Sequence, residues 1–284
     1  MHETPDATTF GPEYFAQIAE LEARHPWSQA MRTLTLALVD REAHGPLRRV
    51  LDVGCGAGAF LDLWLAGHSE TTQRPLRDHS DTTPTPPFGV GIDLYADALG
   101  WARRRPRGTW VRASAGAPPF RDGSFDAIHC ADVLQHLSLD DSTRAIDAFA
   151  RLLRPDGLLA LRVRAPRILR SEPDVDYAHA FSRHRIASEL ARREFRIAFL
   201  SHVNALPSLW AELAAGAGGA QPGGAVKGIQ HRPDRSASAQ LLSAYLRLER
   251  GLLLNVGVPM PFGHTLICIA RKDQLPTSNL KVES

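Results

Sequence analysis

The sequence predicts an α/β protein built on a doubly wound, mostly parallel seven-stranded sheet. Through the first 165 residues, short apolar runs of strand length alternate with segments of helical periodicity. Such alternation is typical of a parallel sheet with helices on both faces. Beyond that point, helices separate two more strand-like runs. The seven runs are residues 49–53, 88–92, 109–112, 125–130, 158–163, 195–201 and 265–270.

Helical patterns fill the segments around these runs. The first fifty residues read as helical because Tyr14, Phe15 and Ile18 recur at near-helical spacing. We expect the apolar residues of the segment 206–214 to pack into the core rather than to anchor a membrane. The further predicted helices are residues 57–65, 97–104, 142–153, 186–193, 206–214 and 238–254.

The chain divides into four parts by pattern. Within the second part, residues 67–87 are rich in Thr, Pro, Ser and Asp, which predicts an exposed, flexible insertion. The four parts are an N-terminal helical cap at 1–45, a ligand-binding core at 46–165, the rest of the sheet with a helical insertion at 166–272, and a disordered tail at 273–284.

Composition excludes several classes of protein. The 284 residues are 44% hydrophobic and 23% charged, which excludes a wholly disordered or fibrous chain. A net charge of +2 is too balanced to indicate nucleic-acid binding. The cysteines Cys55, Cys130 and Cys268 show neither disulfide nor zinc spacing, so we expect a cytoplasmic protein without a bound metal. No signal peptide and no apolar stretch of about 18 residues is visible, so we expect no stable membrane insertion.

The strongest functional signal is the run 51–58, which reads LDVGCGAG. Its glycines, Gly54, Gly56 and Gly58, lie where a strand turns into a helix, so the backbone and its free N–H groups can approach a ligand closely. A purely structural turn is one alternative, and the spacing Gly-x-Gly-x-x-Ala also fits a dinucleotide-binding fingerprint. Asp52 favours a positively charged, phosphate-free nucleoside, because a pyrophosphate gains nothing from a nearby carboxylate.

This run resembles, residue for residue, the first motif of the class I S-adenosylmethionine-dependent methyltransferases, in the small-molecule (type 11-like) branch. The resemblance covers chiefly residues 49–165. It implies a Rossmann-like fold with an antiparallel last strand and S-adenosylmethionine as cofactor. Asp52 and the turn formed by Gly54, Cys55, Gly56 and Gly58 would hold the methionine part of that cofactor.

The run Gly91-Ile92-Asp93-Leu94 resembles the second motif of the same family. The resemblance implies that Asp93 grips both ribose hydroxyls and that Leu94 also contacts the cofactor. In the family this acid lies about twenty residues beyond the glycine turn, and here the 67–87 insertion displaces it. The alternative interpretation of Asp93 is an acid that favours a helix N-terminus.

The stretch after the third predicted strand resembles the family's third motif. Ser114 and Ala115 would lie against the adenine. Ser114 stands where the family has an Asp that accepts a hydrogen bond from the adenine amino group, and a hydroxyl lacks that charge assistance. Either the cofactor then binds more weakly or Ser114 is not the equivalent residue.

After the fourth predicted strand, Ala131-Asp132-Val133-Leu134-Gln135-His136 resembles the family's Asp-Val-Leu-Glu-His, with Gln135 in place of Glu. Ala131 and Asp132 would line the cofactor. His136 is the candidate general base, because imidazole changes charge near neutral pH. A histidine that only orients the loop is the alternative.

The resemblance implies an enzyme that transfers a methyl group by in-line displacement to O, N or C of a small-molecule acceptor. The Asn-Pro-Pro-Tyr run of adenine and amide methylation is absent after the fourth strand, and so is the glutamate pair of arginine methylation. Neither a nucleic-acid partner nor a metal is expected. Two alternatives stay open: an NAD(P)-dependent oxidoreductase, which lacks a Tyr-x-x-x-Lys set here, and a catalytically inactive partner protein with the same fold.

The acceptor is expected to lie under residues 166–260, a region whose aromatic and histidine residues are mixed with arginines. Oligomeric state is not indicated by any pattern. The pocket candidates of this region are Tyr177, His179, Phe181 and His184.

Overall fold

The computed structural model describes residues 11–71, 87–167, 179–216 and 237–273. Several sequence expectations fall outside these residues. They are most of the insertion 67–87, nearly all of the tail 273–284, most of the glycine-rich stretch 216–228, and the pocket candidate Tyr177.

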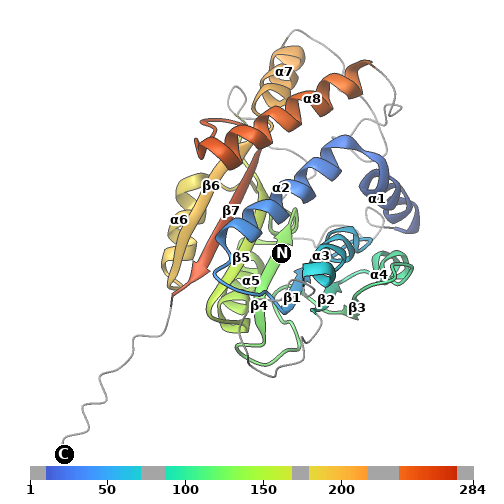
Figure 1. Ribbon diagram of the computed structural model, residues 1–284, viewed down its shortest axis with the longest axis vertical. Helices are drawn as coiled ribbons and strands as arrows, with labels where there is room; N and C mark the ends of the chain where they lie inside the picture. Colours follow the sequence, from blue (N-terminus) through green and yellow to red (C-terminus); the bar gives the residue numbers. More distant parts are fainter. Residues whose placement is uncertain (1–10, 72–86, 168–178, 217–236, 274–284) are drawn as a thin grey trace, which may run out of the picture.

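The predicted fold class is confirmed. One seven-stranded sheet has the order β3-β2-β1-β4-β5-β7-β6 (Figure 1). The first five strands run parallel, and β7 lies antiparallel between β5 and β6. The strands are β1 Arg49–Val53, β2 Phe88–Asp93, β3 Thr109–Arg112, β4 Phe125–Ala131, β5 Leu153–Arg164, β6 Phe195–Val203 and β7 Thr265–Lys272.

Helices cover both faces of this sheet (Figure 1). α2, α3 and α8 pack on one face around Leu38, Trp64 and Leu246, and α5 and α6 pack on the other around Phe149 and Ile186. The helices are α1 Pro12–Arg24, α2 Pro26–Glu42, α3 Ala59–Thr71, α4 Ala96–Ala102, α5 Leu139–Leu152, α6 Arg183–Ala191, α7 Ala205–Gly216 and α8 Ala237–Gly251, with short helices η1 Leu134–His136 and η2 Leu252–Val256.

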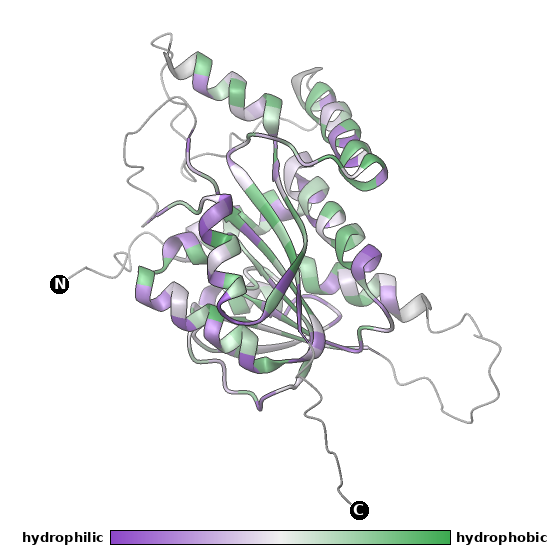
Figure 2. Ribbon diagram, turned by 90° about the vertical axis from the view of Figure 1, so that its left-hand side faces the viewer, coloured by the Kyte–Doolittle hydropathy of each residue, from purple (hydrophilic) through white to green (hydrophobic). Residues whose placement is uncertain are grey.

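The strands are apolar on both sides because both faces are covered. Phe125 to Cys130 of β4 are all buried, and Figure 2 shows hydrophobic strands in the middle with helices of mixed hydropathy around them. None of the described helices has the length and apolar character needed to cross a membrane.

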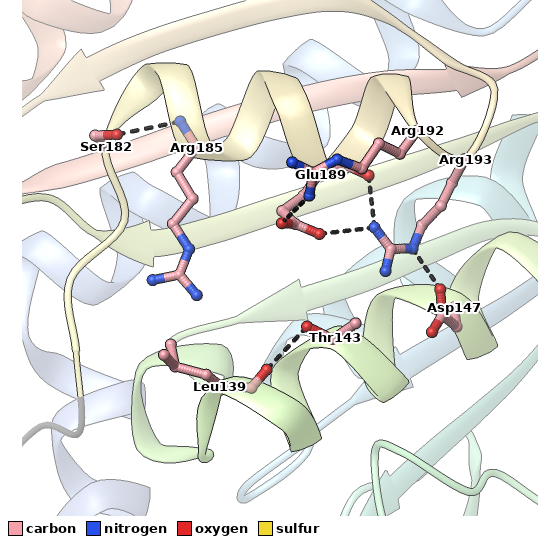
Figure 3. Close-up of polar contacts among 8 residues, drawn as sticks. All are labelled: Leu139, Thr143, Asp147, Ser182, Arg185, Glu189, Arg192 and Arg193. Carbon is pink, nitrogen blue, oxygen red and sulfur yellow. Dashed lines mark hydrogen bonds and ion pairs between the residues drawn. The ribbon is translucent and has the colours of Figure 1, made fainter.

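Local signals place the helix ends. Ser138 accepts a hydrogen bond from the backbone N–H of Asp141 at 3.1 Å and so caps α5, whose first turn carries two acids that favour the helix dipole. At the other end of the pair α5 and α6, Arg193 bonds to Asp147 at 2.5 Å and to Glu189 at 2.8 Å, which fixes α6 over α5 (Figure 3).

The expectation that the apolar residues of α7 pack into the core is wrong for three of them. Leu206, Trp210 and Leu213 are 57%, 65% and 57% exposed among the described residues. The inward face of α7 is polar instead: Ser208 accepts a hydrogen bond from the backbone N–H of His264 at 2.9 Å, and Glu212 lies 2.7 Å from the ring of that histidine. A polar set of contacts therefore decides which side of α7 faces the sheet.

Candidate active site

The carboxyl ends of the parallel strands bring the glycine turn and the second motif together. Gly54, Gly56 and Gly58 have φ of 66°, 53° and 76°, in the left-handed region that favours glycine. The backbone N–H groups of Gly54 and Cys55 donate to the carbonyl of Ile92 at 2.8 and 2.9 Å. The turn after β1 is thereby tied to the end of β2.

The three glycines meet different surroundings. A Cβ at Gly54 would lie 2.1 Å from the side chain of the valine two residues beyond β4, and one at Gly58 would lie 2.5 Å from the ring of Trp110. Packing of the protein against the turn therefore requires these two glycines. At Gly56 the one neighbour of such a Cβ among the described residues is Glu22 Oε1, at 3.2 Å. Of the three glycines, Gly56 is therefore the one where side chains do not pack tightly against the turn.

Asp93 holds the glycine turn directly. Its Oδ2 accepts a hydrogen bond from Gly56 N–H at 3.0 Å, and its Oδ1 accepts one from Tyr95 N–H at 3.0 Å. The side chain is 8% exposed, and this burial raises the pKa of the carboxyl while the two N–H groups oppose the rise. A carboxylate has about four acceptor positions, so acceptor capacity remains for a ligand. Leu94, next in the chain, is 53% exposed at the same edge.

Asp52 forms a buried pair that the sequence analysis did not foresee. Its Oδ1 lies 2.7 Å from Nδ1 of His129, and the two side chains are 3% and 8% exposed. The imidazole ring stacks on Phe60 of α3 with ring centroids 3.5 Å apart. The signal was present in the sequence, because β1 and β4 are parallel neighbours in which Asp52 is paired in register with His129.

The end of β4 carries a second ion pair. Asp132, with φ 58°, accepts hydrogen bonds from Arg162 of β5 at 2.6 and 3.0 Å. The guanidinium lies 5.2 Å from the centre of the Trp27 ring, on α2. Asp132 and Ala131 are therefore at the predicted edge, and α2 lies above them.

The other predicted residues lie around the same edge. His136 ends the short helix η1 and is half-buried. The neighbouring Gln135 is buried, and its Oε1 has no hydrogen-bond partner. Ser114 is exposed just beyond β3, where its hydroxyl accepts a hydrogen bond from Gly116 N–H at 3.3 Å, and Ala115 is half-buried beside it.

Helices α1 and α2 add two charged residues that no motif indicated. Within the part of the chain that the structure describes, Oε2 of Glu22 is buried without a hydrogen-bond partner, and so is Nε of Arg32. Another nitrogen of Arg32 donates to the backbone carbonyl of Glu22. The Glu22 carboxyl lies over Gly56, as described above, so an acid from the helical cap reaches the glycine turn.

Of the pocket candidates expected between residues 166 and 260, His179 forms a small cluster with Ser142 of α5 and with Phe181. His179 Nε2 lies 3.3 Å from the hydroxyl of Ser142, and its ring contacts that of Phe181 edge-on at 4.8 Å. Burial and the charge of Arg185 lower the pKa of His179. Phe181 is fully buried and packs in the core, whereas His184 is exposed on the surface.

Sheet order, the glycine turn after β1 and the acid that closes it from β2 define the class I S-adenosylmethionine-dependent methyltransferase fold. Residues 87–161 match a family model described as a methyltransferase domain.

Comparisons with individual proteins agree with this class. The ubiquinone biosynthesis O-methyltransferase of Aromatoleum aromaticum is 31% identical over 130 residues, which cover 44% of this chain and 47% of the relative. The chain thus spans about half the length of this curated relative. The N-methyltransferase NodS from Bradyrhizobium japonicum, solved with S-adenosylhomocysteine, is 17% identical with a TM-score of 0.51 and covers 89% of this chain and 90% of its own. The [4+2]-cyclase SpnF is 20% identical with a TM-score of 0.53 and covers 88% and 83%. The two structures share the fold with this chain.

Proposed function

We propose that the protein transfers a methyl group from S-adenosylmethionine to a small-molecule acceptor. The observation that carries this proposal is the contact between Asp93 and Gly56, which joins a carboxylate with unused acceptor positions to a glycine turn at the carboxyl edge of the sheet. A ribose diol needs such an acceptor, and a nucleoside without phosphates tolerates the neighbouring acids.

The described residues fit this cofactor. Among the described residues, the buried Oε2 of Glu22 and Nε of Arg32 lack hydrogen-bond partners, and a zwitterionic amino acid group offers one partner for each. Asp93 would hold the ribose, and Ser114 and Ala115 would lie by the adenine. The remaining residues proposed to contact the cofactor are Asp52, Gly54, Cys55, Gly56, Gly58, Leu94, Ala131 and Asp132.

S-adenosylmethionine, when bound, supplies a methyl carbon bonded to a positively charged sulfur. The protein's residues position the acceptor in line with that carbon, which is worth about 7–11 kcal/mol of barrier, and the helices above the edge exclude water. These residues would hold the acceptor oxygen in line with the methyl carbon, so that its bond to carbon could form as the carbon–sulfur bond breaks and leaves its electron pair on sulfur. His136 takes the proton from a hydroxyl acceptor.

The acceptor is proposed to be a hydroxyl of a small molecule. Support comes from the curated relative, whose name describes an O-methyltransferase of ubiquinone biosynthesis. We further propose a bacterial cytoplasmic enzyme without a nucleic-acid partner, because Cys55, Cys130 and Cys268 are free, buried thiols, the net charge is +2 and the matched relatives are bacterial.

Calorimetry with S-adenosylhomocysteine tests the proposal. The wild-type protein is expected to bind it, and Asp93→Ala is expected to weaken binding by at least tenfold, because the variant loses both the ribose acceptor and the anchor of the turn. Asp97→Ala, an exposed acid four residues away, is the matched control and should bind like the wild type. Absence of binding at millimolar ligand would reject the proposal, and quenching of NADH fluorescence instead would favour an oxidoreductase.

A further inference from the structure

Glu22 is a half-buried acid, and its surroundings do not explain the burial of one of its carboxylate oxygens. It lies on α1, outside the sheet, yet its Oε1 lies 3.2 Å from the position of a Cβ at Gly56. Its Oε2 is buried and has no hydrogen-bond partner. A carboxylate in this position costs free energy unless a positive group or a donor reaches it.

Charged groups surround Glu22 without contacting its carboxylate closely enough to pair with it. Arg32 from α2, Arg105 after α4 and Arg162 from β5 favour its ionised form, and Asp52 from β1 disfavours it. Burial outweighs the arginines and raises the pKa of Glu22 to about 7. Arg162 is already occupied by Asp132, and Arg105 donates to the carbonyl of Ala57. The site therefore holds an acid that changes protonation near neutral pH.

Arg32 presents the complementary feature. Its Nε is buried without a partner, while another of its nitrogens donates to the backbone carbonyl of Glu22. The two side chains come from successive helices, and each leaves one buried polar atom without a hydrogen-bond partner among the described residues. Within the described chain, Oε2 of Glu22 lacks a donor and Nε of Arg32 lacks an acceptor. A ligand that carries an ammonium and a carboxylate on one carbon would supply both.

We propose that Glu22 binds the ammonium and Arg32 the carboxylate of the cofactor's amino acid end, and that cofactor binding expels a proton from Glu22. This inference rests on the proposed function, because it assigns two residues of the helical cap to the same cofactor. In the free protein, burial raises the pKa of Glu22 to about 7, so its carboxyl can hold a proton near neutral pH. The ammonium favours the ionised form, so the proton leaves on binding, and affinity falls as the pH drops below 7.

Calorimetry in two buffers of different ionisation enthalpy measures this proton. Wild-type protein titrated with S-adenosylhomocysteine at pH 7 should release about half a proton, and its affinity should fall roughly five- to tenfold from pH 8 to pH 6. Glu22→Gln should release none, should bind about tenfold more weakly at pH 8, and should lose the pH dependence. Glu20→Gln, an exposed acid on the same helix, is the control and should behave like the wild type.

Methylthioadenosine, which lacks the amino acid end, separates this site from the rest of the cofactor site. Wild type and Glu22→Gln should bind it equally, which also shows that the variant is folded. Equal affinity of both proteins for S-adenosylhomocysteine, or no proton release from the wild type, would overturn the inference while the proposed function stands. No binding of either ligand to the wild type would overturn both.

Discussion

His136 is the residue on which the proposed chemistry depends most. If it accepts the acceptor's proton, His136→Asn should lower kcat by roughly 10²–10⁴-fold, because general-base catalysis contributes about that much. Binding of S-adenosylhomocysteine should change less than twofold, since the residue acts on the acceptor. His44→Asn, which alters an exposed histidine, is the control for turnover and binding. A variant with unchanged kcat would show that His136 only orients the loop.

The buried pair of Asp52 and His129 is expected to contribute to the stability of the fold. His129→Ala leaves a carboxylate that is 3% exposed without its partner and removes the ring that stacks on Phe60. We expect the free energy of unfolding to fall by about 3–5 kcal/mol, the usual cost of removing one partner of a buried pair and leaving the other partner's charge uncompensated. Urea denaturation measures this change, with His44→Ala as the exposed control. A loss below 1 kcal/mol would mean that the pair contributes little.

Among single residues, the sequence predicted those that sit in motifs and missed those that do not. Gly56 and Asp93 meet in the structure although the insertion 67–87 lengthens the sequence between their two motifs. His129 could have been found by aligning two predicted parallel strands, because its partner is in register. Glu22 could not, since its position depends on how α1 packs across the edge of the sheet, and no local pattern encodes that packing.

At the scale of elements, a buried carboxylate on α8 organises the start of α7. Oε2 and Oε1 of Glu249 accept hydrogen bonds from the backbone N–H groups of Asn204 and Ala205 at 2.9 and 3.0 Å. The hydroxyl of Tyr245 donates to Glu249 at 2.6 Å and accepts from Leu206 N–H at 3.1 Å. Burial and the bond to Glu249 raise the pKa of Tyr245 well above its usual value. The two helices are joined by this network.

Glu249→Ala should therefore destabilise the protein by about 2–4 kcal/mol, because it leaves two backbone N–H groups without acceptors. Tyr245→Phe, which removes only the hydroxyl, should cost about 1 kcal/mol. Guanidinium denaturation measures both. Arg250→Ala, at the exposed neighbouring position, is the control and should change stability by less than about 0.5 kcal/mol. If Glu249→Ala resembles this control, the network does not hold α7 in place.

The positions of strands and helices could be predicted from apolar runs and helical periodicity. The face that each helix turns toward the sheet could not. All seven strands lie where apolar runs predicted them, although β5 begins at Leu153, before the turn expected at 155–157. Helix α7 was predicted as an element, but its apolar stripe was assigned to the core. Periodicity identifies a stripe, whereas the opposite side of α7, with Ser208 and Glu212, has the hydrogen-bond partners that decide the outcome.

For the whole molecule, the helical cap is the part most able to respond to a ligand. α1 packs against α2 and α4 rather than on the sheet, and the ring of Phe15 meets that of Tyr95 at 5.5 Å. The central strands are instead enclosed on both faces. Local stability follows such differences in burial, so α1 is expected to open more readily than β5 and β7.

Hydrogen exchange tests this coupling between cap and glycine turn. With S-adenosylhomocysteine at about 100 times its Kd, global stability should rise by about 2.7 kcal/mol. Exchange should slow in α1 and in residues 54–58, because the ligand satisfies Glu22 and the turn together. Methylthioadenosine should protect residues 54–58 and leave α1 unchanged, since it offers no ammonium to Glu22. If both ligands protect α1 equally, closure of the cap depends on the nucleoside and not on the charged groups of α1 and α2.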